Sequence, residues 1–177
     1  MHNITFNTSF MILTNSFFSK NVSGDNLNFF LNETCKDAMN ITDFVESIQI
    51  QLRDLDKIGE SGFVSGISDI IVNKLKSIDV TKRPVHCSDA KRETMYVRDA
   101  NKWEKEDDNK QKMHKMIDTL SHNNLIKLSD WKDAHPLSRE SSSCQSDQYN
   151  QIVLGALDTS KENNIKIIKN IAKEVKV

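Results

Sequence analysis

Residues 83–103 read RPVHCSDAKRETMYVRDANKW, and this stretch decides the fold that we expect. Its apolar residues recur with a period of two, as the side chains of a half-buried strand do. Val85 and Cys87 share one face of a first strand, and Met95 and Val97 share one face of a second. We therefore predict an antiparallel hairpin in which these four side chains are buried together.

Turn-forming residues flank the second strand. A polar loop occupies residues 88–92, and Asp-Ala-Asn at 99–101 tolerates the backbone angles of a tight turn. Residues 102–104 are a candidate third strand. The stretch is therefore predicted to form a small antiparallel meander of two to three strands at about residues 84–106, with its second face polar and open to solvent.

Amphipathic helices are expected around this meander. From residue 27 onward many apolar residues recur with the 3.6-residue period of helices, so we predict a mainly helical α+β fold with four to five helices around the hairpin. Capping residues, glycines and a proline set the expected boundaries. The five main expected helices are one capped by Thr42 and ended by residues 59–62, one over 63–78, one that starts at Asp107 or Asp108 and is broken at Asn123-Asn124, one carrying Tyr149 and Ile152, and a last one after a capping box at 159–162. A short additional one, capped by Ser129 and stopped by Pro136, lies between the third and the fourth.

Length and local composition predict the domain organisation. A chain of 177 residues supports one core, and we expect a single domain over residues 26–177 after a flexible leader at 1–25. The apolar run at 10–13 is far shorter than the roughly 20 residues that cross a bilayer, so no membrane partner is expected. A serine-rich linker at 137–147 is expected before the two C-terminal helices.

Overall charge and cysteine usage argue against several classes of function. A formal net charge of −1 argues against a chain that binds nucleic acid non-specifically. Cys35, Cys87 and Cys144 are an odd number at wide spacing, which is typical of reduced thiols in an intracellular protein. The chain has no Cys-x-x-Cys pair and no histidine at helical i, i+4 spacing from another histidine or a cysteine, so neither a metal nor a cofactor is expected.

Positive charge is concentrated locally. Residues 82–98 hold five basic and two acidic side chains. These cations are a candidate surface for phosphates, beside which Tyr96 offers a stacking ring. The alternative is that they pair with Asp89, Glu93 and Asp99 on a solvated hairpin. The residues predicted to bind nucleic acid or a partner are Lys82, Arg83, His86, Asp89, Lys91, Arg92, Tyr96 and Arg98, and we name the five Lys and Arg residues among them the basic cluster.

Two candidate catalytic arrangements involve His86. His86 and Cys87 are neighbours on a strand, so their side chains point to opposite faces and do not form a nucleophile and its base. His86 and Asp89 form either a general acid–base pair or a structural pair in which the carboxylate orients the ring. A nuclease-like phosphodiesterase that uses His86, Asp89 and Arg92 is therefore the alternative to a non-catalytic module. We assign no residue a catalytic role.

Four segments carry a resemblance to known proteins: NFFLNETCKDAMNITDF at 28–44, KRPVHCSDAKRETMYVR at 82–98, KWEK at 102–105 and KIIKNIAKEV at 166–175. They resemble the C-terminal region of a family of giant-virus proteins, from the nucleocytoplasmic large DNA viruses. Members of this family often carry a two-Cys-two-His zinc finger ahead of the region. The resemblance covers about residues 26–177, and RPVHCSD at 83–89 is a specific motif. Since this chain has no cysteine before Cys35, we expect no zinc finger in it.

The resemblance implies a non-catalytic interaction or assembly module that acts during infection, through protein partners or nucleic acid. It implies a location in the host cytoplasm, at the viral factory, or in the nucleus or the virion. The residues of the last helix add a candidate homodimer, because their apolar stripe is wide enough either to close the monomer's own core or to join a neighbour. The stripe consists of Ile165, Ile168, Ala172 and Val175, widened by Ile167 and Ile171.

Overall fold

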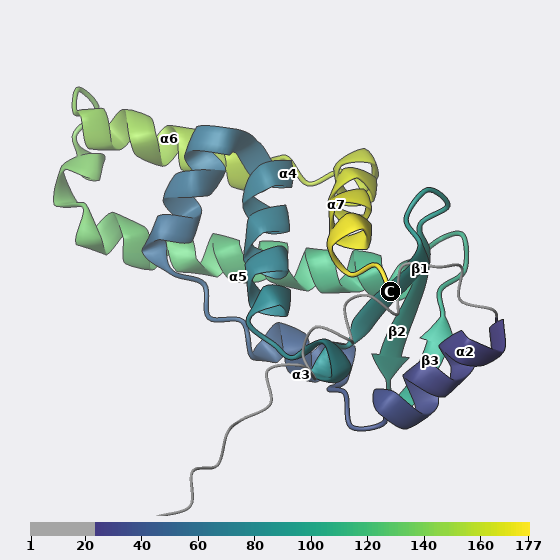
Figure 1. The fold of residues 1–177 in the computed structure, drawn as a ribbon. Helices are drawn as coiled ribbons and strands as arrows, with labels where there is room; N and C mark the ends of the chain where they lie inside the picture. Colours follow the sequence, from purple (N-terminus) through teal and green to yellow (C-terminus); the bar gives the residue numbers. More distant parts are fainter. Residues whose placement is uncertain (1–23) are drawn as a thin grey trace, which may run out of the picture.

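A three-stranded antiparallel sheet lies at one end of a group of helices in the computed structural model, which describes residues 24–177 (Figure 1). The strands are β1 (Val85–Asp89), β2 (Thr94–Asp99) and β3 (Lys102–Lys105), in the order β1-β2-β3. The predicted meander is therefore confirmed. A two-residue turn, in which Ala100 and Asn101 have φ of 45° and 62°, joins β2 to β3.

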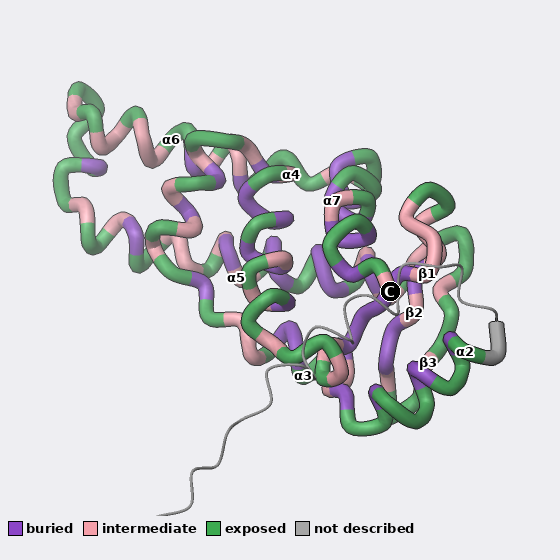
Figure 2. The backbone as a smooth tube through the Cα atoms, in the orientation of Figure 1, coloured by how far each residue is buried: buried purple, intermediate pink, exposed green. Residues whose placement is uncertain are grey.

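The apolar face of the hairpin is part of the main core. Val85 pairs with Val97 and Cys87 pairs with Met95, and each of these four side chains is at most 1% exposed. Figure 2 shows buried backbone along both strands. The predicted register of the hairpin is confirmed, because a slip of one residue would turn all four side chains to the other face.

Helices make up most of the described residues, and the fold is the predicted mainly helical α+β class. The longest, α4 and α5, pack against each other, and α6 and α7 both pack against α4. Three single-turn elements complete the set. The helical elements are α2 (Gly24–Phe29), η1 (Phe30–Thr34), α3 (Ile41–Glu46), α4 (Leu52–Lys76), η2 (Val80–Lys82), α5 (Gln111–Ala134), η3 (Pro136–Arg139), α6 (Cys144–Leu157) and α7 (Lys161–Glu174).

The helix expected from residue 42 is divided in two. It ends at Glu46 in α3, and α4 begins at Leu52, where the backbone N–H of Gln51 donates to Asp54 Oδ2 over 2.8 Å. This local cap starts a new helix, so the expected helix has a first break between Glu46 and Leu52, before the glycines. Gly62 does interrupt α4, since its φ of 82° kinks the helix as the sequence indicated.

The predicted break at Asn123-Asn124 is wrong, and α5 continues through it to Ala134. Asn124 is buried, and its amide donates to the carbonyl of Leu120, so its side chain bonds within the helix instead of capping a new one. Ser129 therefore lies within α5 and does not cap a helix. The helix does end before Pro136, as expected.

The segment expected as a serine-rich linker has regular structure instead. It contains η3 and the first turn of α6, and Ser138 is buried. The Ser143 hydroxyl accepts from the N–H of Ser146 and donates to the carbonyl of Leu137. One of the serines in this segment, Ser143, is therefore the N-cap of α6. The cap of α7 is likewise Ser160, one residue after the predicted Thr159.

The chain's last residues lie along the outer edge of β1. Cys87 donates to the carbonyl of Val175 over 2.9 Å, and Val177 donates to the carbonyl of Cys87 over 3.0 Å. These bonds form a short parallel bridge after α7, and Figure 1 shows the C-terminus beside β1. The last helix is thereby attached both to α4 and to the sheet.

The second face of the sheet is covered, contrary to the expectation that it is open. Residues 24–39, which we name the cover segment, lie over it and bury Leu27, Phe30 and Leu31 against the strands. Most of the expected leader, residues 1–23, lies outside the described part. Residues 24 and 25 begin α2, so the domain starts slightly earlier than predicted.

Candidate functional site: the covered face and the basic hairpin

The cover segment forms a small apolar cluster of its own on the sheet. Its buried residues pack against Tyr96, Trp103 and Val177, which come from β2, β3 and the C-terminus. The alternation of β2 and β3 places Tyr96 and Trp103 on the face opposite the main core. The sheet therefore separates two apolar clusters, and the smaller one depends on the cover segment. The cover segment contributes the buried residues of this smaller cluster, which are Leu27, Phe30, Leu31, Cys35 and Ala38.

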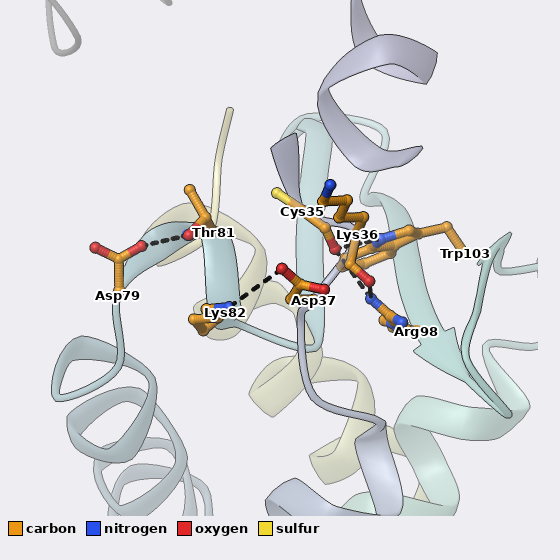
Figure 3. Close-up of polar contacts among 8 residues, drawn as sticks. All are labelled: Cys35, Lys36, Asp37, Asp79, Thr81, Lys82, Arg98 and Trp103. Atoms are coloured by element: carbon orange, nitrogen blue, oxygen red, sulfur yellow. Dashed lines mark hydrogen bonds and ion pairs between the residues drawn. The ribbon is translucent and has the colours of Figure 1, made fainter. Parts of the chain in front are cut away.

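Arg98 and Trp103 anchor the cover segment at its polar end (Figure 3). The Arg98 guanidinium donates to the carbonyls of Cys35, over 3.1 Å, and of Lys36. The Trp103 indole N–H donates to the carbonyl of Cys35 over 3.3 Å. These carbonyls directly follow η1, where a helix end leaves acceptors without intrahelical donors. Arg98, which the sequence predicted to bind phosphate, is therefore buried and hydrogen-bonded to the backbone.

His86 lies between the sheet and the cover segment and is fully buried. Its ring centre is 5.1 Å from that of Phe30 and 5.4 Å from that of Trp103, and its Nε2 is 3.7 Å from Cys35 Sγ. Burial, and secondarily the charge of Arg83, lowers the pKa of His86 to about 4. The Val80 carbonyl opposes this lowering, although Nδ1 has no hydrogen-bond partner of acceptable geometry. The imidazole is therefore neutral at physiological pH.

The contact between Cys35 and His86 is one of the side-chain pairings at this site that sequence reasoning missed. Burial, and then the charge of Asp79, raises the pKa of Cys35 to about 12, while Arg98 opposes the rise. A neutral thiol beside a neutral imidazole is not an activated nucleophile, since the reactive species is the thiolate. No local pattern marks the pair, because 51 residues separate its members.

His86 and Asp89 do not form the acid–base pair that the sequence allowed. Asp89 lies at the exposed hairpin tip, where its Oδ1 accepts from the N–H groups of Lys91, over 2.9 Å, and Arg92, over 3.2 Å. These bonds, led by that from Arg92, lower the pKa of Asp89. Its other oxygen is 3.8 Å from Arg92 Nε. Because His86 is sealed inside and Asp89 is exposed, the structure does not combine them with Arg92 in one site.

The basic cluster is split into three environments. Lys82 pairs with Asp37 at 3.7 Å, and Arg83 Nε donates to the carbonyl of Ile78 over 3.2 Å (Figure 3 shows the former contact). Arg98 is buried beneath the cover segment. Lys91 and Arg92 remain exposed at the tip. The alternative of pairing within the hairpin is therefore correct for Arg92.

Two other acidic residues of the hairpin pair outside the basic cluster. Glu93 is 3.6 Å from Lys110, and Asp99 is 3.1 Å from Lys112. Tyr96, expected as an open stacking ring, is half-buried against the cover segment. Of the residues predicted to bind a partner, Lys82 and those at the hairpin tip thus keep exposed charged side chains, and Lys82 is paired with Asp37.

Cavities of the described residues lie away from this face. The larger, of about 680 Å³, is lined by α5 and α7 residues including His114, Lys161 and Ile165. A smaller one, of about 180 Å³, lies between α3 and α5 and includes Lys112 and Met116. Neither contains His86, Asp89 or Arg92, so these cavities give the phosphodiesterase hypothesis no substrate pocket.

Comparison with known proteins gives no match: no protein-family model, no curated protein and no solved structure is significantly similar to this chain. Within residues 24–177, no cluster of three or more His, Cys, Asp or Glu side chains is arranged to hold a metal ion. Over the same residues, every helix is too short or too polar to cross a bilayer.

Proposed function

We propose that this chain is a non-catalytic interaction module whose exposed contact element is the hairpin tip at residues 88–93. The carrying observation is that Asp89 holds the tip in one conformation while Lys91 and Arg92 point their charges into solvent. Glu93, with a φ of 52°, closes the loop and is held by Lys110. A tip held by these bonds presents Lys91 and Arg92 to an acidic partner with little loss of conformational entropy on binding.

The partner in this proposal carries clustered negative charge, as nucleic acids and acidic protein segments do. The sealed position of His86 supports a binding role over catalysis, because a general base must reach its substrate. In the setting that the resemblance to giant-virus proteins implies, such a module works during infection, in the viral factory, the nucleus or the virion. A zinc finger on another chain or segment would then supply a further DNA contact.

Self-association through the last helix has weaker support than binding to a different partner. Ile167, Ile168, Ile171 and Ala172 are buried in the monomer's own core, and Ile165 is the apolar α7 residue that stays exposed. In this structure α7 therefore closes the core of its own chain, which is the alternative to a contact with a second copy. The proposal therefore places the contact on the hairpin and not on α7.

The test compares two double variants in binding to DNA and RNA. Lys91→Ala with Arg92→Ala removes the tip's charge, and Arg53→Ala with Lys57→Ala removes the same charge from exposed positions on α4. We expect the tip variant to weaken binding irrespective of base sequence. We also expect the slope of log affinity against log salt concentration to fall by the amount that about two phosphate contacts contribute. The α4 variant should bind as the unmodified chain does. Equal effects of the two variants would remove the tip from the proposal.

A further inference from the structure

The sheet face beneath the cover segment has a chemistry unusual for a core. Tyr96 pairs across the strands with His86 on one side and with Lys105 on the other, and Arg98 pairs with Trp103. Cross-strand partners share a face, so two aromatic rings, an imidazole and a guanidinium form one surface. Aromatic rings with adjacent cations on an antiparallel sheet are the features with which proteins stack and hold unpaired bases.

The cover segment satisfies this face incompletely. His86 Nδ1 and Arg98 Nε are buried without hydrogen-bond partners, although both residues are more than nine-tenths buried. Each such atom loses its bonds to water and gains none in return. Other polar groups of the face do have hydrogen-bond partners. Arg98 and Trp103 donate N–H groups to the backbone carbonyls of residues 35 and 36. Those carbonyls occupy the places where phosphate or base oxygens would accept.

The cover segment is also separable from the rest of the molecule. Its buried apolar residues form a cluster distinct from the main core, and of the cover segment Met39 packs against that core. Besides the Arg98 and Trp103 anchors and the contact between Cys35 and His86, its polar contacts include an ion pair between Lys82 and Asp37 and a backbone bond from Met39 to Lys82. A segment with few buried contacts and few anchors opens at a lower free-energy cost than the rest of the protein.

We infer that the sheet face formed by His86, Tyr96, Arg98 and Trp103 is a binding surface for single-stranded nucleic acid, which the cover segment occupies in the free protein. This inference rests on the proposed function and names its partner. Lys105 on β3 and Lys91 and Arg92 at the tip lie around the face and meet the phosphates. Duplex bases are stacked on one another, so a duplex does not use this surface.

Hydrogen exchange of the full chain tests the displacement directly. An oligonucleotide of about 12 unpaired residues, a length within the range of known single-strand sites, is added to saturation, and the duplex of the same sequence serves as control. We expect faster exchange in residues 24–39 with the single strand, since its binding releases the cover segment. Unchanged or slower exchange there at saturation overturns the inference.

A second measurement varies the cover segment. Leu31→Asn weakens its apolar contact, whereas Phe29→Asn changes an exposed residue of the neighbouring turn. Because a covered site binds with an affinity reduced by the fraction that is open, Leu31→Asn should tighten single-strand binding about tenfold and Phe29→Asn should not. Adding Tyr96→Leu and Trp103→Leu to Leu31→Asn should remove the gain. Near-native circular dichroism confirms that the helices remain folded.

The outcomes separate this inference from the proposed function. If Leu31→Asn leaves affinity unchanged while Lys91→Ala with Arg92→Ala still lowers it, the tip binds and the covered face does not. If duplex and single strand bind equally well and both lose affinity in the tip variant, the covered face is again excluded. If no nucleic acid binds even with Leu31→Asn, both nucleic-acid roles fail, and the tip is left with an acidic protein partner.

Discussion

The imidazole of His86 is held neutral by its surroundings. Phe30 and Trp103 pack against the ring, and the positive charge of Arg83 opposes its protonation. Cys35, the polar side chain in contact with it, is itself neutral. A proton added to this ring would be buried within the influence of Arg83, so protonation and closure of the cover segment oppose each other.

The first prediction follows from the lowered pKa of His86. In the unfolded chain the imidazole takes up a proton below about pH 6.5, whereas in the folded chain it does so only near pH 4. Stability is therefore full above pH 6.5 and falls as the pH drops toward 4, by up to about 3 kcal/mol. Urea unfolding of the wild type and of His86→Phe across this range measures the difference.

Other titrating groups are shared by both proteins, so the comparison isolates His86. Glu106 contributes with the opposite sign, because burial raises its pKa and its penalty is relieved as the pH falls. His122→Gln, at an exposed position, serves as the matched control and should keep the wild-type pH dependence. A His86→Phe curve parallel to that of the wild type would show that the buried ring is not the titrating group.

Alternation in the sequence correctly predicted the buried set Val85, Cys87, Met95 and Val97, because one strand face belongs to the main core. It could not predict that the opposite face is buried as well. That outcome depends on residues 24–39, whose apolar side chains reach the sheet only through the tertiary fold. Polar residues such as His86 and Arg98 look exposed in sequence, and no local period distinguishes a covered face from an open one.

Elements of the fold meet closely where α4 crosses α6. A Cβ on Gly155 would lie 2.7 Å from the backbone oxygen of Ile58, and one on Gly59 would lie 2.8 Å from Ile152 Cγ1. Glycine at these two positions lets the helices approach to a distance that side chains would prevent. The contact attaches α6 to the first half of α4, on the side away from the sheet.

We predict that Gly155→Ala destabilises the protein by about 1–3 kcal/mol, since its Cβ meets rigid backbone and α6 must shift. Leu154→Ala, at an adjacent position that is 72% exposed, should change stability by about 0.5 kcal/mol or less. Urea denaturation followed by circular dichroism measures both. A Gly155→Ala variant as stable as Leu154→Ala would mean that α6 can move away from α4 at no cost.

The cover segment should open before the rest of the molecule does. Cys35 belongs to it, whereas Cys87 belongs to the main core and is bonded to the C-terminal residues. Cys144 is exposed. With an alkylating reagent in rising urea, we expect Cys144 to react first, then Cys35, and Cys87 only at global unfolding. Mass spectrometry of the modified peptides identifies each thiol, and simultaneous reaction of Cys35 and Cys87 would mean that the two clusters unfold as one.

Element boundaries were predictable where one local signal dominates and not where two compete. Pro136 ends α5 as expected, and Gly62 kinks α4. Asn124 and the serines after residue 137 also carry break signals, but the first bonds within its helix and the second set includes a helix cap. Whether such residues end a helix depends on the burial that the flanking segments find, which is a tertiary property.

At the scale of the whole molecule, α7 decides whether copies associate. Its apolar stripe faces α4 and β1, which leaves Ile165 as the exposed isoleucine of a face that carries Lys161, Lys166 and Lys169. A two-fold contact through this face would bring these lysines against their own copies, and one isoleucine buries far less area than a stable interface needs. We therefore predict a monomer.

Light scattering at high protein concentration should give the mass of one chain, 20.3 kDa. A chain ended at Asp158 is not a clean comparison, because it loses Ile167, Ile168 and the C-terminal residues that bridge to β1, and we expect it to unfold. Ile165→Glu is the informative variant, since it changes the exposed face alone. If the intact chain has twice the expected mass and Ile165→Glu returns it to one, α7 forms an interface despite its lysines. If the mass is doubled in both, the contact lies elsewhere, and Lys91→Ala with Arg92→Ala then tests whether the hairpin tip forms it.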